Sequence, residues 1–243
     1  MDSQTSAPSS VVSLSYGLVV KHSEYDLLNP FESGLAWVGS SIANGTSYSR
    51  AFALGTPNTS VSASINIGLY GGEASSTSNS NTSHLIRLYQ GSTSGTALGS
   101  LSWSGLGSRT GEFSAAALST GTNTFFLKNE ASSSNSKPYV DYINLSYGME
   151  LTSSESYEFF APLDGNAITF SFDALPDMVW DITDASNPEN LLVASAGGGG
   201  SITLDLASDT THRFLAIDLD DITEVADLTL KTESPFGSLR LQN

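Results

Sequence analysis

Short runs of alternating or β-branched residues, each ended by Gly, Asn, Ser or Pro, constrain the fold of this chain most strongly. No stretch places apolar residues at i, i+3, i+4 and i+7 over three helical turns. Short strands joined by long polar connections are typical of β-sandwiches and jelly rolls. We therefore predict an all-β fold. The expected strands are Val11–Val20, Ser49–Leu54, Ser60–Tyr70, His84–Tyr89, Thr124–Lys128, Tyr139–Tyr147, Ser156–Phe160, Ala167–Phe172, Met178–Ile182, Asn190–Ala194, Ser201–Leu206, His212–Asp218 and Thr229–Lys231.

Charge divides the chain into two unequal parts. Residues 1–149 contain eight acidic and six basic side chains, a net charge of −2, whereas residues 150–243 contain 17 and three, a net charge of −14. Such a change in composition indicates a domain boundary. We predict a Ser/Thr-rich, jelly-roll-like β-sandwich over residues 1–148, followed by a second, smaller and acidic β-sandwich over residues 149–243.

The overall composition excludes several classes of partner. The net charge of −16 leaves nothing to neutralise phosphates, so we expect no nucleic acid and no anionic membrane surface as partners. No apolar run reaches the length that spans a membrane. The chain has no cysteine, and its surface is expected to be rich in Ser and Thr, as in many extracellular β-proteins. Residues 1–10 lack the features of a signal peptide, so we expect a secreted or envelope protein whose leader has been removed.

Catalytic motifs are absent from the sequence. It contains no G-x-S-x-G elbow, no H-E-x-x-H motif and only three histidines, His22, His84 and His212, which we interpret as surface or strand-edge residues. The run Gly197–Gly200 lacks the Lys-Ser/Thr and the helix that a phosphate-binding loop needs. We therefore expect no enzymatic activity from this chain.

Two groups of acidic residues are candidates for calcium, which prefers clustered carboxylate and carbonyl oxygens. Asp218, Asp220 and Asp221 follow a predicted strand, and Glu24 and Asp26 precede the turn at Asn29-Pro30. The alternative for each group is a solvated strand end. No cofactor is required by the sequence, and calcium is the one that it makes possible.

Tryptophans offer one candidate for ligand binding. A flat aromatic ring stacks on the C–H face of a sugar, and Trp37 lies between Gly34 and Gly39 outside any predicted strand. Trp103 and Trp180 lie within apolar strand patterns, so core packing is expected for both. Trp37 is therefore the candidate ligand-binding residue.

One local motif predicts a structured turn. Asp181, Thr183 and Asp184 are followed by Asn187 and Pro188, between two predicted strands. Aspartates in such positions accept hydrogen bonds from nearby backbone N–H groups. The motif thus indicates a β-turn and not an active site.

The same motif resembles a known family. Val179-Trp-Asp-Ile-Thr-Asp184 with Asn187-Pro188 is similar to a signature found upstream of gingipain-type cysteine peptidase domains, a group that includes the sortase of the type IX secretion system and related surface proteins. Further segments resemble the same region in the same order along the chain. They are His84–Tyr89, Gly99–Gly105, Leu118–Thr124, Tyr139–Tyr147 and Thr211–Ile217.

The resemblance implies a non-catalytic region at the front of a longer protein in the envelope of a Gram-negative bacterium. The peptidase His and Cys would lie beyond Asn243, and the downstream peptidase domain would be the partner that this region packs on, positions or shields. Two alternatives stay open. One is a carbohydrate-binding module that binds a glycan, and the other is a cell-surface adhesion or scaffold protein that binds another protein.

Overall fold

The computed structural model describes residues 11–29, 37–74, 81–152, 155–161, 167–196, 198–205 and 211–222. Regular structure in these residues consists of β-strands and one short 3-10 turn, η1 (Leu219–Asp221). The prediction of an all-β fold is confirmed. The predicted strand Thr229–Lys231 lies outside the described residues.

No helix among the described residues is long and apolar enough to span a bilayer.

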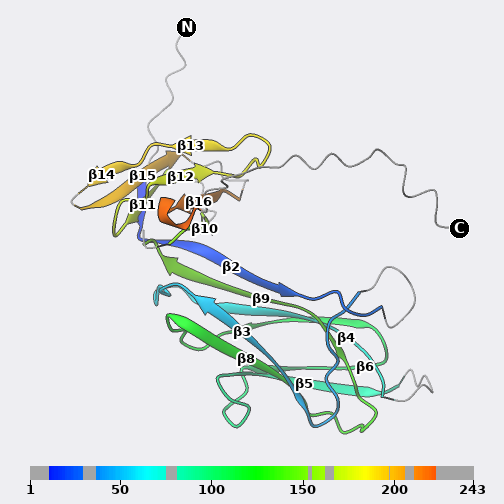
Figure 1. Ribbon diagram of the computed structural model, residues 1–243. Coiled ribbons are helices and arrows are strands. Elements are labelled where there is room, and N and C mark those ends of the chain that lie inside the picture. Colours follow the sequence, from blue (N-terminus) through cyan, green and yellow to red (C-terminus); the bar gives the residue numbers. More distant parts are fainter. Residues whose placement is uncertain are drawn as a thin grey trace, which may run out of the picture.

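A first sandwich is built from strands between residues 16 and 150 (Figure 1). Its strands pair antiparallel in two layers, so neighbouring strands are joined without crossover helices. One layer has the order β2 (Tyr16–Glu24), β9 (Tyr139–Glu150), β4 (Ser64–Tyr70), β7 (Ser108–Ser114). The other has the order β3 (Ser47–Leu54), β8 (Gly121–Asn129), β5 (Ser83–Gln90), β6 (Gly99–Ser104).

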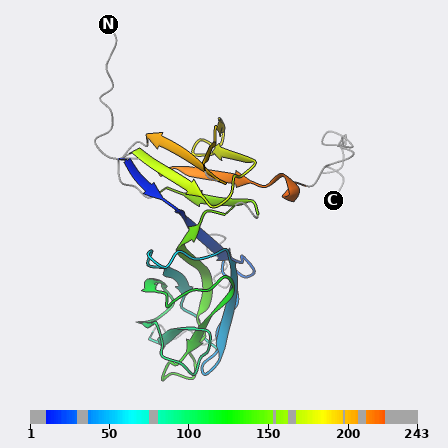
Figure 2. The same cartoon turned by 90° about the vertical axis from the view of Figure 1, so that its left-hand side faces the viewer.

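A second, smaller sandwich lies at one end of the first (Figures 1 and 2). In its first layer β1 pairs parallel with β11, and all other pairs in this sandwich are antiparallel. That layer has the order β1 (Val11–Leu14), β11 (Ala167–Phe172), β15 (Gly199–Asp205), β14 (Ala194–Ala196). The other has the order β10 (Tyr157–Phe160), β16 (Arg213–Ile217), β12 (Met178–Asp181), β13 (Glu189–Leu191).

Alternation of side chains explains why these segments form sandwiches. In β8 the side chains of Asn123, Phe125, Leu127 and Asn129 are buried, and those between them are more exposed. Successive strand residues point to opposite faces, so one face of β8 fills the core and the other meets solvent. The same period of two predicted the strand from the sequence.

The two sandwiches share one sheet and one core. Strands β2 and β10 pair only at Leu18 and Phe160, and this pair joins the two four-stranded layers into one eight-stranded sheet. Beside it, the Phe159 ring lies 5.2 Å from the ring of Phe170 and 5.3 Å from that of Phe214. Buried residues of both sandwiches belong to one contiguous apolar cluster. The junction is therefore packed with side chains.

The predicted domain boundary at residue 148 stays a prediction. Strand β9 runs across it, from Tyr139 to Glu150. Residues 11–14 precede the boundary in sequence, yet they pair with β11, which follows it. The polypeptide thus begins its described part in the second sandwich and enters the first at Ser15.

We expect Gly17→Ala to destabilise both sandwiches. A Cβ at Gly17 would collide with the Cβ and ring of Phe159, whose other contacts hold it in place. Overpacking of this kind costs about 1–3 kcal/mol of unfolding free energy. Urea unfolding followed by circular dichroism measures it. Gly107→Ala is the matched control, because a Cβ there meets no atom within 4 Å. Equal stability of the two variants would contradict the packing described.

Candidate functional site

Three of the residues singled out in the sequence lie in one pocket of about 350 Å³ on the first sandwich. We call it the Trp37 pocket. Its lining includes Glu24, the last residue of β2, whereas β2 meets the second sandwich near its start, at Leu18. The pocket therefore lies at the end of the β2-β9-β4-β7 layer that is farther from the second sandwich. Its lining residues are Glu24, Asp26, Trp37, Val38, Tyr70, Ser108 and Asp141.

Hydrogen bonds fix the backbone that directly follows Trp37. Val38 donates its N–H to the Leu28 carbonyl at 2.8 Å, and Leu28 donates to the Val38 carbonyl at 2.9 Å. The next residue, Gly39, donates to the Val140 carbonyl of β9 at 2.7 Å. Val38 is buried, whereas the Trp37 side chain is 49% exposed. The indole is therefore held at the rim of the pocket with much of its surface in solvent.

A β-bulge turns Asp141 toward the same pocket. Along β9 and β4, Tyr142 pairs with Gly68, but the next pair is Val140 with Leu69, so Asp141 is an extra residue. Val140 and Leu69 are both buried in the core. A bulge re-aims side chains and is common next to functional sites. Without the bulge, the regular alternation of β9 would point the Asp141 carboxylate to the opposite face of the sheet. With it, the carboxylate lies on the pocket side.

Tyr142 adds an aromatic surface beside Asp141. A Cβ at Gly68 would collide with the Tyr142 ring, so the ring lies across Gly68, which it helps to bury. An aromatic ring over a cross-strand glycine shields exposed backbone. The solvent side of the sheet next to the pocket is thus partly aromatic.

The charges around the pocket are mostly uncompensated. Burial, and then the nearby carboxylates of Glu24 and Asp26, raise the pKa of Asp141 above its ordinary value of 3.8. Glu24 contacts the imidazole Nε2 of His22 at 3.0 Å, and His22 Nδ1 lies 2.5 Å from the Asn144 side-chain oxygen. Within the described residues no cation or hydrogen-bond donor contacts the Asp141 carboxylate.

The predicted calcium ligands do not come together as one set. Glu24 and Asp26 lie in the Trp37 pocket, but Asp218, Asp220 and Asp221 lie in the second sandwich, at η1. There the Asp218 carboxylate accepts the N–H of Asp220 at 3.0 Å and caps the turn. In the described part of the chain no three His, Asp or Glu side chains are grouped to hold a metal ion. Calcium stays a prediction from the sequence.

The turn after β12 is organised by its aspartates. Asp181 accepts the N–H of Thr183 at 2.9 Å, and Asp184 accepts the N–H of Ser186 at the same distance. Asp184 also accepts the Ser186 hydroxyl at 2.6 Å, and these bonds lower the pKa of Asp184 below its ordinary value. Thr183 accepts the N–H of Arg213 in β16 and so ties the turn to the neighbouring strand. Asn187 donates its N–H to the Asp184 carbonyl at 3.0 Å, and Pro188 follows it.

The interpretation of His84 as a surface residue was wrong. Its side chain is fully buried, with Nδ1 2.8 Å from the Ser136 hydroxyl and Nε2 3.1 Å from the Gly105 carbonyl. A carbonyl only accepts, so Nε2 carries the hydrogen and Nδ1 accepts from Ser136. The ring also packs against Trp103, with centroids 4.8 Å apart.

The Ser136–His84 pair leaves no local pattern in the sequence, because 52 residues separate its members. The geometry is that of a nucleophile and a base, but both side chains are enclosed. Asn129, also buried, donates to the Ser136 hydroxyl and to the Ile42 carbonyl. We therefore assign the pair to the polar core that holds the loops around residues 42 and 136.

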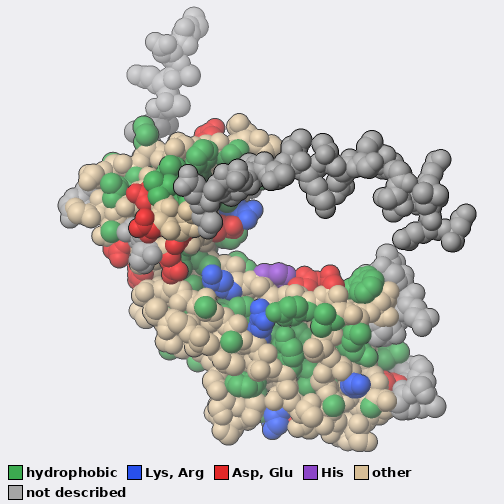
Figure 3. All heavy atoms as spheres, in the orientation of Figure 1, with side chains coloured by type: hydrophobic (Ala, Val, Ile, Leu, Met, Phe, Trp, Pro, Cys, Tyr) green, Lys and Arg blue, Asp and Glu red, His purple; other side chains and the backbone are tan. Residues whose placement is uncertain are grey.

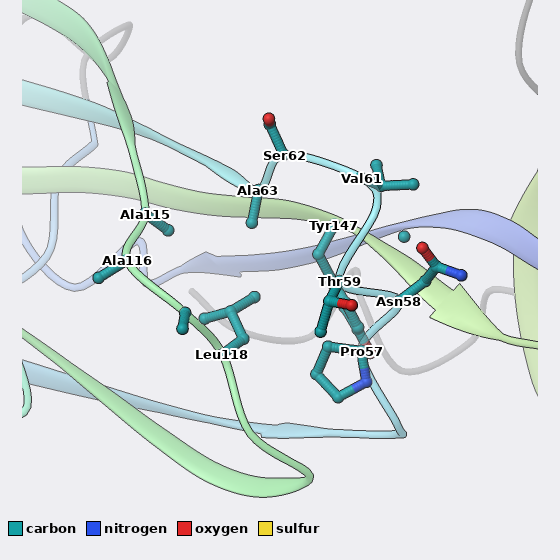
Figure 4. A pocket seen from close by; sticks show the side chains of 12 residues that line it. Pro57, Asn58, Thr59, Val61, Ser62, Ala63, Ala115, Ala116, Leu118 and Tyr147 are labelled. Atoms are coloured by element: carbon teal, nitrogen blue, oxygen red, sulfur yellow. The ribbon is translucent and has the colours of Figure 1, made fainter.

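Two other pockets flank the segment 57–63. A small one of about 160 Å³ lies between this segment and residues 115–118, above the buried Tyr147 (Figure 4). Burial raises the pKa of Tyr147 to about 12, and the remaining lining is uncharged. A larger groove of about 470 Å³ lies between the sandwiches, where the molecular surface is hollowed (Figure 3). It is lined mainly by apolar side chains, among them Leu18, Val20 and Phe160.

Comparison with known proteins gives similarity in structure only. No family model and no curated protein sequence matches the chain. The structure of dimeric latent PorU from Porphyromonas gingivalis is similar with a TM-score of 0.72 and 16% identity, over 87% of this chain and 21% of that chain. At this identity the likeness shows the fold, and the chain spans about a fifth of the length of PorU.

Two carbohydrate-binding structures are similar to a lesser degree. The CBM36-1 domain of a multidomain xylanase from the hindgut metagenome of Trinervitermes trinervoides has a TM-score of 0.36 and 14% identity, over 53% of this chain and 95% of that chain. The carbohydrate-binding module CBM36 in complex with calcium and xylotriose has a TM-score of 0.34 and 16% identity, over 51% and 98%. These two similarities are too low to support an argument about a site.

Asp141→Asn is expected to raise the melting temperature at pH 7. Because the folded-state pKa of Asp141 is raised, the ionised carboxylate disfavours folding, and this cost fades as the pH falls toward the ordinary value of 3.8. The gain in the variant should therefore shrink between pH 7 and pH 4. Thermal unfolding in EDTA measures it, with the exposed Asp220→Asn as control.

The same variant tests calcium. If Ca²⁺ binds Glu24 and Asp26, as the sequence predicts, CaCl₂ will stabilise the unaltered protein, and Asp141→Asn, which removes a neighbouring negative charge, will be stabilised less. An unchanged melting temperature of the unaltered protein in millimolar CaCl₂ would contradict the calcium prediction for these residues.

His84 is expected to weaken the fold at acidic pH. Burial lowers its pKa below the ordinary value of 6.5, so the unfolded chain binds a proton that the folded one does not. Stability should therefore fall as the pH drops below 6.5, until the folded-state pKa is reached. His84→Gln should cost about 1–3 kcal/mol at pH 8, because buried hydrogen bonds are lost, and less at pH 5.

The measurement is urea unfolding of both proteins across this pH range. His22→Gln is the matched control, because His22 is exposed. A difference between His84→Gln and the unaltered protein that does not vary with pH would contradict the assignment of His84 as a buried neutral imidazole.

Proposed function

We propose that this chain is a non-catalytic accessory region of a larger secreted or surface protein of the gingipain type, and that it packs on or positions a downstream peptidase domain. The observation that carries the proposal is the similarity of 87% of the chain to part of latent PorU, with a TM-score of 0.72. The ordered sequence motifs support it independently, because they are a property of the amino-acid sequence alone.

The motif residues occupy positions that shape the fold. His84 and Trp103 pack against each other in the first sandwich, and Asn123 bonds the backbone of Ser119. Asp181 organises the turn after β12. These positions support an architecture shared with part of latent PorU. A non-catalytic role for this region follows from the proposal.

The groove between the sandwiches is the surface that suits a packing partner best. Val20 is 46% exposed and lies beside Leu18 and Phe160 in a mostly apolar lining. Apolar side chains in a concave surface are favourable sites for association, because their burial removes them from water. The downstream domain is the partner that the proposal assigns to this groove.

The first test is the reading frame that follows the codon for Asn243. The proposal requires a cysteine peptidase domain in the same gene product, with its catalytic His and Cys. A stop codon directly after Asn243 in the natural gene would exclude the proposal.

The second test is association with that peptidase domain. We expect the separately purified chain to bind it in calorimetry, and Val20→Glu to weaken binding by about tenfold or more, because a charge would be buried in the groove. Leu192→Glu is the matched control, since Leu192 is 95% exposed in the second sandwich and lines no described pocket. Unaltered binding by Val20→Glu would exclude the groove, and no binding by the unaltered chain would exclude the accessory role.

A further inference from the structure

The Trp37 pocket is not used by the accessory role proposed above. It lies at the end of the first sandwich away from the groove, and none of its lining residues lines the groove. It combines an aromatic side chain at the rim, hydroxyl groups at Tyr70 and Ser108, and carboxylates. A small number of polar groups that converge on a pocket with an aromatic wall is typical of a small-ligand site.

Trp37 restricts what kind of ligand fits. Its indole is 49% exposed although its neighbours in sequence are fixed to β9 and to Leu28 by backbone bonds. Exposing a large aromatic surface on a rigid backbone is costly in water, because apolar area stays hydrated. A ligand with a flat face of C–H groups would cover it. Pyranose rings have such a face.

The carboxylates restrict the ligand further. An ionised Asp or Glu only accepts hydrogen bonds, and a sugar ring presents several hydroxyl donors. Asp141 is directed here by the bulge, and no described side chain donates to it. Anionic ligands are disfavoured, since Glu24, Asp26 and Asp141 would repel them.

The surface beyond the pocket is open and polar. Along the solvent side of the sheet, His22 pairs with Asn144, which pairs with Asn66 on β4, and Tyr142 covers Gly68 in the next row. The face of the sheet next to the pocket thus presents further amide and aromatic side chains on neighbouring strands. A polymer can lie over this face, whereas a closed cavity would admit only a free monosaccharide.

We propose that the Trp37 pocket binds a pyranose unit of a neutral polysaccharide, with Trp37 stacked on the ring face and Asp141 accepting hydroxyl groups. The adjoining face of β2, β9 and β4 then contacts the neighbouring units of the same chain. This function is independent of the downstream domain, so either proposal can fail without the other.

The test is calorimetry with xylo-, cello-, manno- and galacto-oligosaccharides of three to six units, with oligogalacturonate as the anionic probe. We expect at least one neutral series to bind with a dissociation constant below about 5 mM, and longer members to bind more tightly. Trp37→Ala should lower the affinity about tenfold or more, and Trp37→Phe should restore most of it. Leu192→Ala, in the other sandwich, is the matched control.

Tryptophan fluorescence gives a second readout that does not depend on heat. A bound sugar should change the emission of the unaltered protein, and the change should vanish in Trp37→Phe, because Trp103 and Trp180 lie outside the pocket. Asp141→Ala should weaken binding while leaving the fold intact by circular dichroism. The proposal is overturned if no neutral oligosaccharide binds, if Trp37→Ala binds as well as the unaltered protein, or if oligogalacturonate binds equally tightly.

Discussion

The packing of Phe159 against Gly17 is the contact on which the rest of the structure depends. Strand β2 leaves the second sandwich with Gly17 facing the Phe159 ring, and the absence of a Cβ there lets the two sandwiches approach. Phe159 in turn contacts Phe170 and Phe214 from both layers of the second sandwich. A single backbone pair between β2 and β10 could not fix the relative position of two sheets, whereas interlocked aromatic rings in a common core can.

This junction also determines where the apolar groove and the Trp37 pocket lie along β2. Because β2 pairs with β10 only at Leu18, the second sandwich turns away from the rest of β2, and the apolar groove opens between the two bodies. The far end of β2 carries Glu24 and the Trp37 pocket. One strand thus has a packing surface at its beginning and a ligand pocket at its end. The two proposed functions can operate together because they use opposite ends of β2.

Sequence periodicity located many of the strands but not their pairing, and it merged β1 (Val11–Leu14) and part of β2 into one predicted strand, Val11–Val20. The alternating pattern predicted β11 with its observed bounds, Ala167–Phe172, whereas β7 (Ser108–Ser114) was missed because its exposed edge position needs few apolar residues. Burial of His84 was missed because its partners, Ser136 and Gly105, are distant in sequence. The sequence predicts Trp37 as a ligand-binding residue and Glu24 with Asp26 as a calcium group, and only the fold shows that the three share a pocket. Asp141 was not proposed at all, because a bulge depends on the register of two strands and leaves no local pattern.

Hydrogen bonding separates the described acids that organise turns in the second sandwich from Asp141 in the Trp37 pocket. In the second sandwich, five described aspartates accept backbone N–H groups at strand ends and in turns. The residues and their donors are Asp177 from Leu219, Asp181 from Thr183, Asp184 from Ser186, Asp218 from Asp220 and Asp221 from Ser156. Asp184 has a lowered pKa because its carboxylate accepts the hydroxyl and the backbone N–H of Ser186, whereas burial and the nearby carboxylates of Glu24 and Asp26 raise the pKa of Asp141, which has no donor among the described residues. No described residue donates to Asp141, which lines the same pocket as the exposed Trp37, so a ligand that donates hydroxyl groups would satisfy this carboxylate.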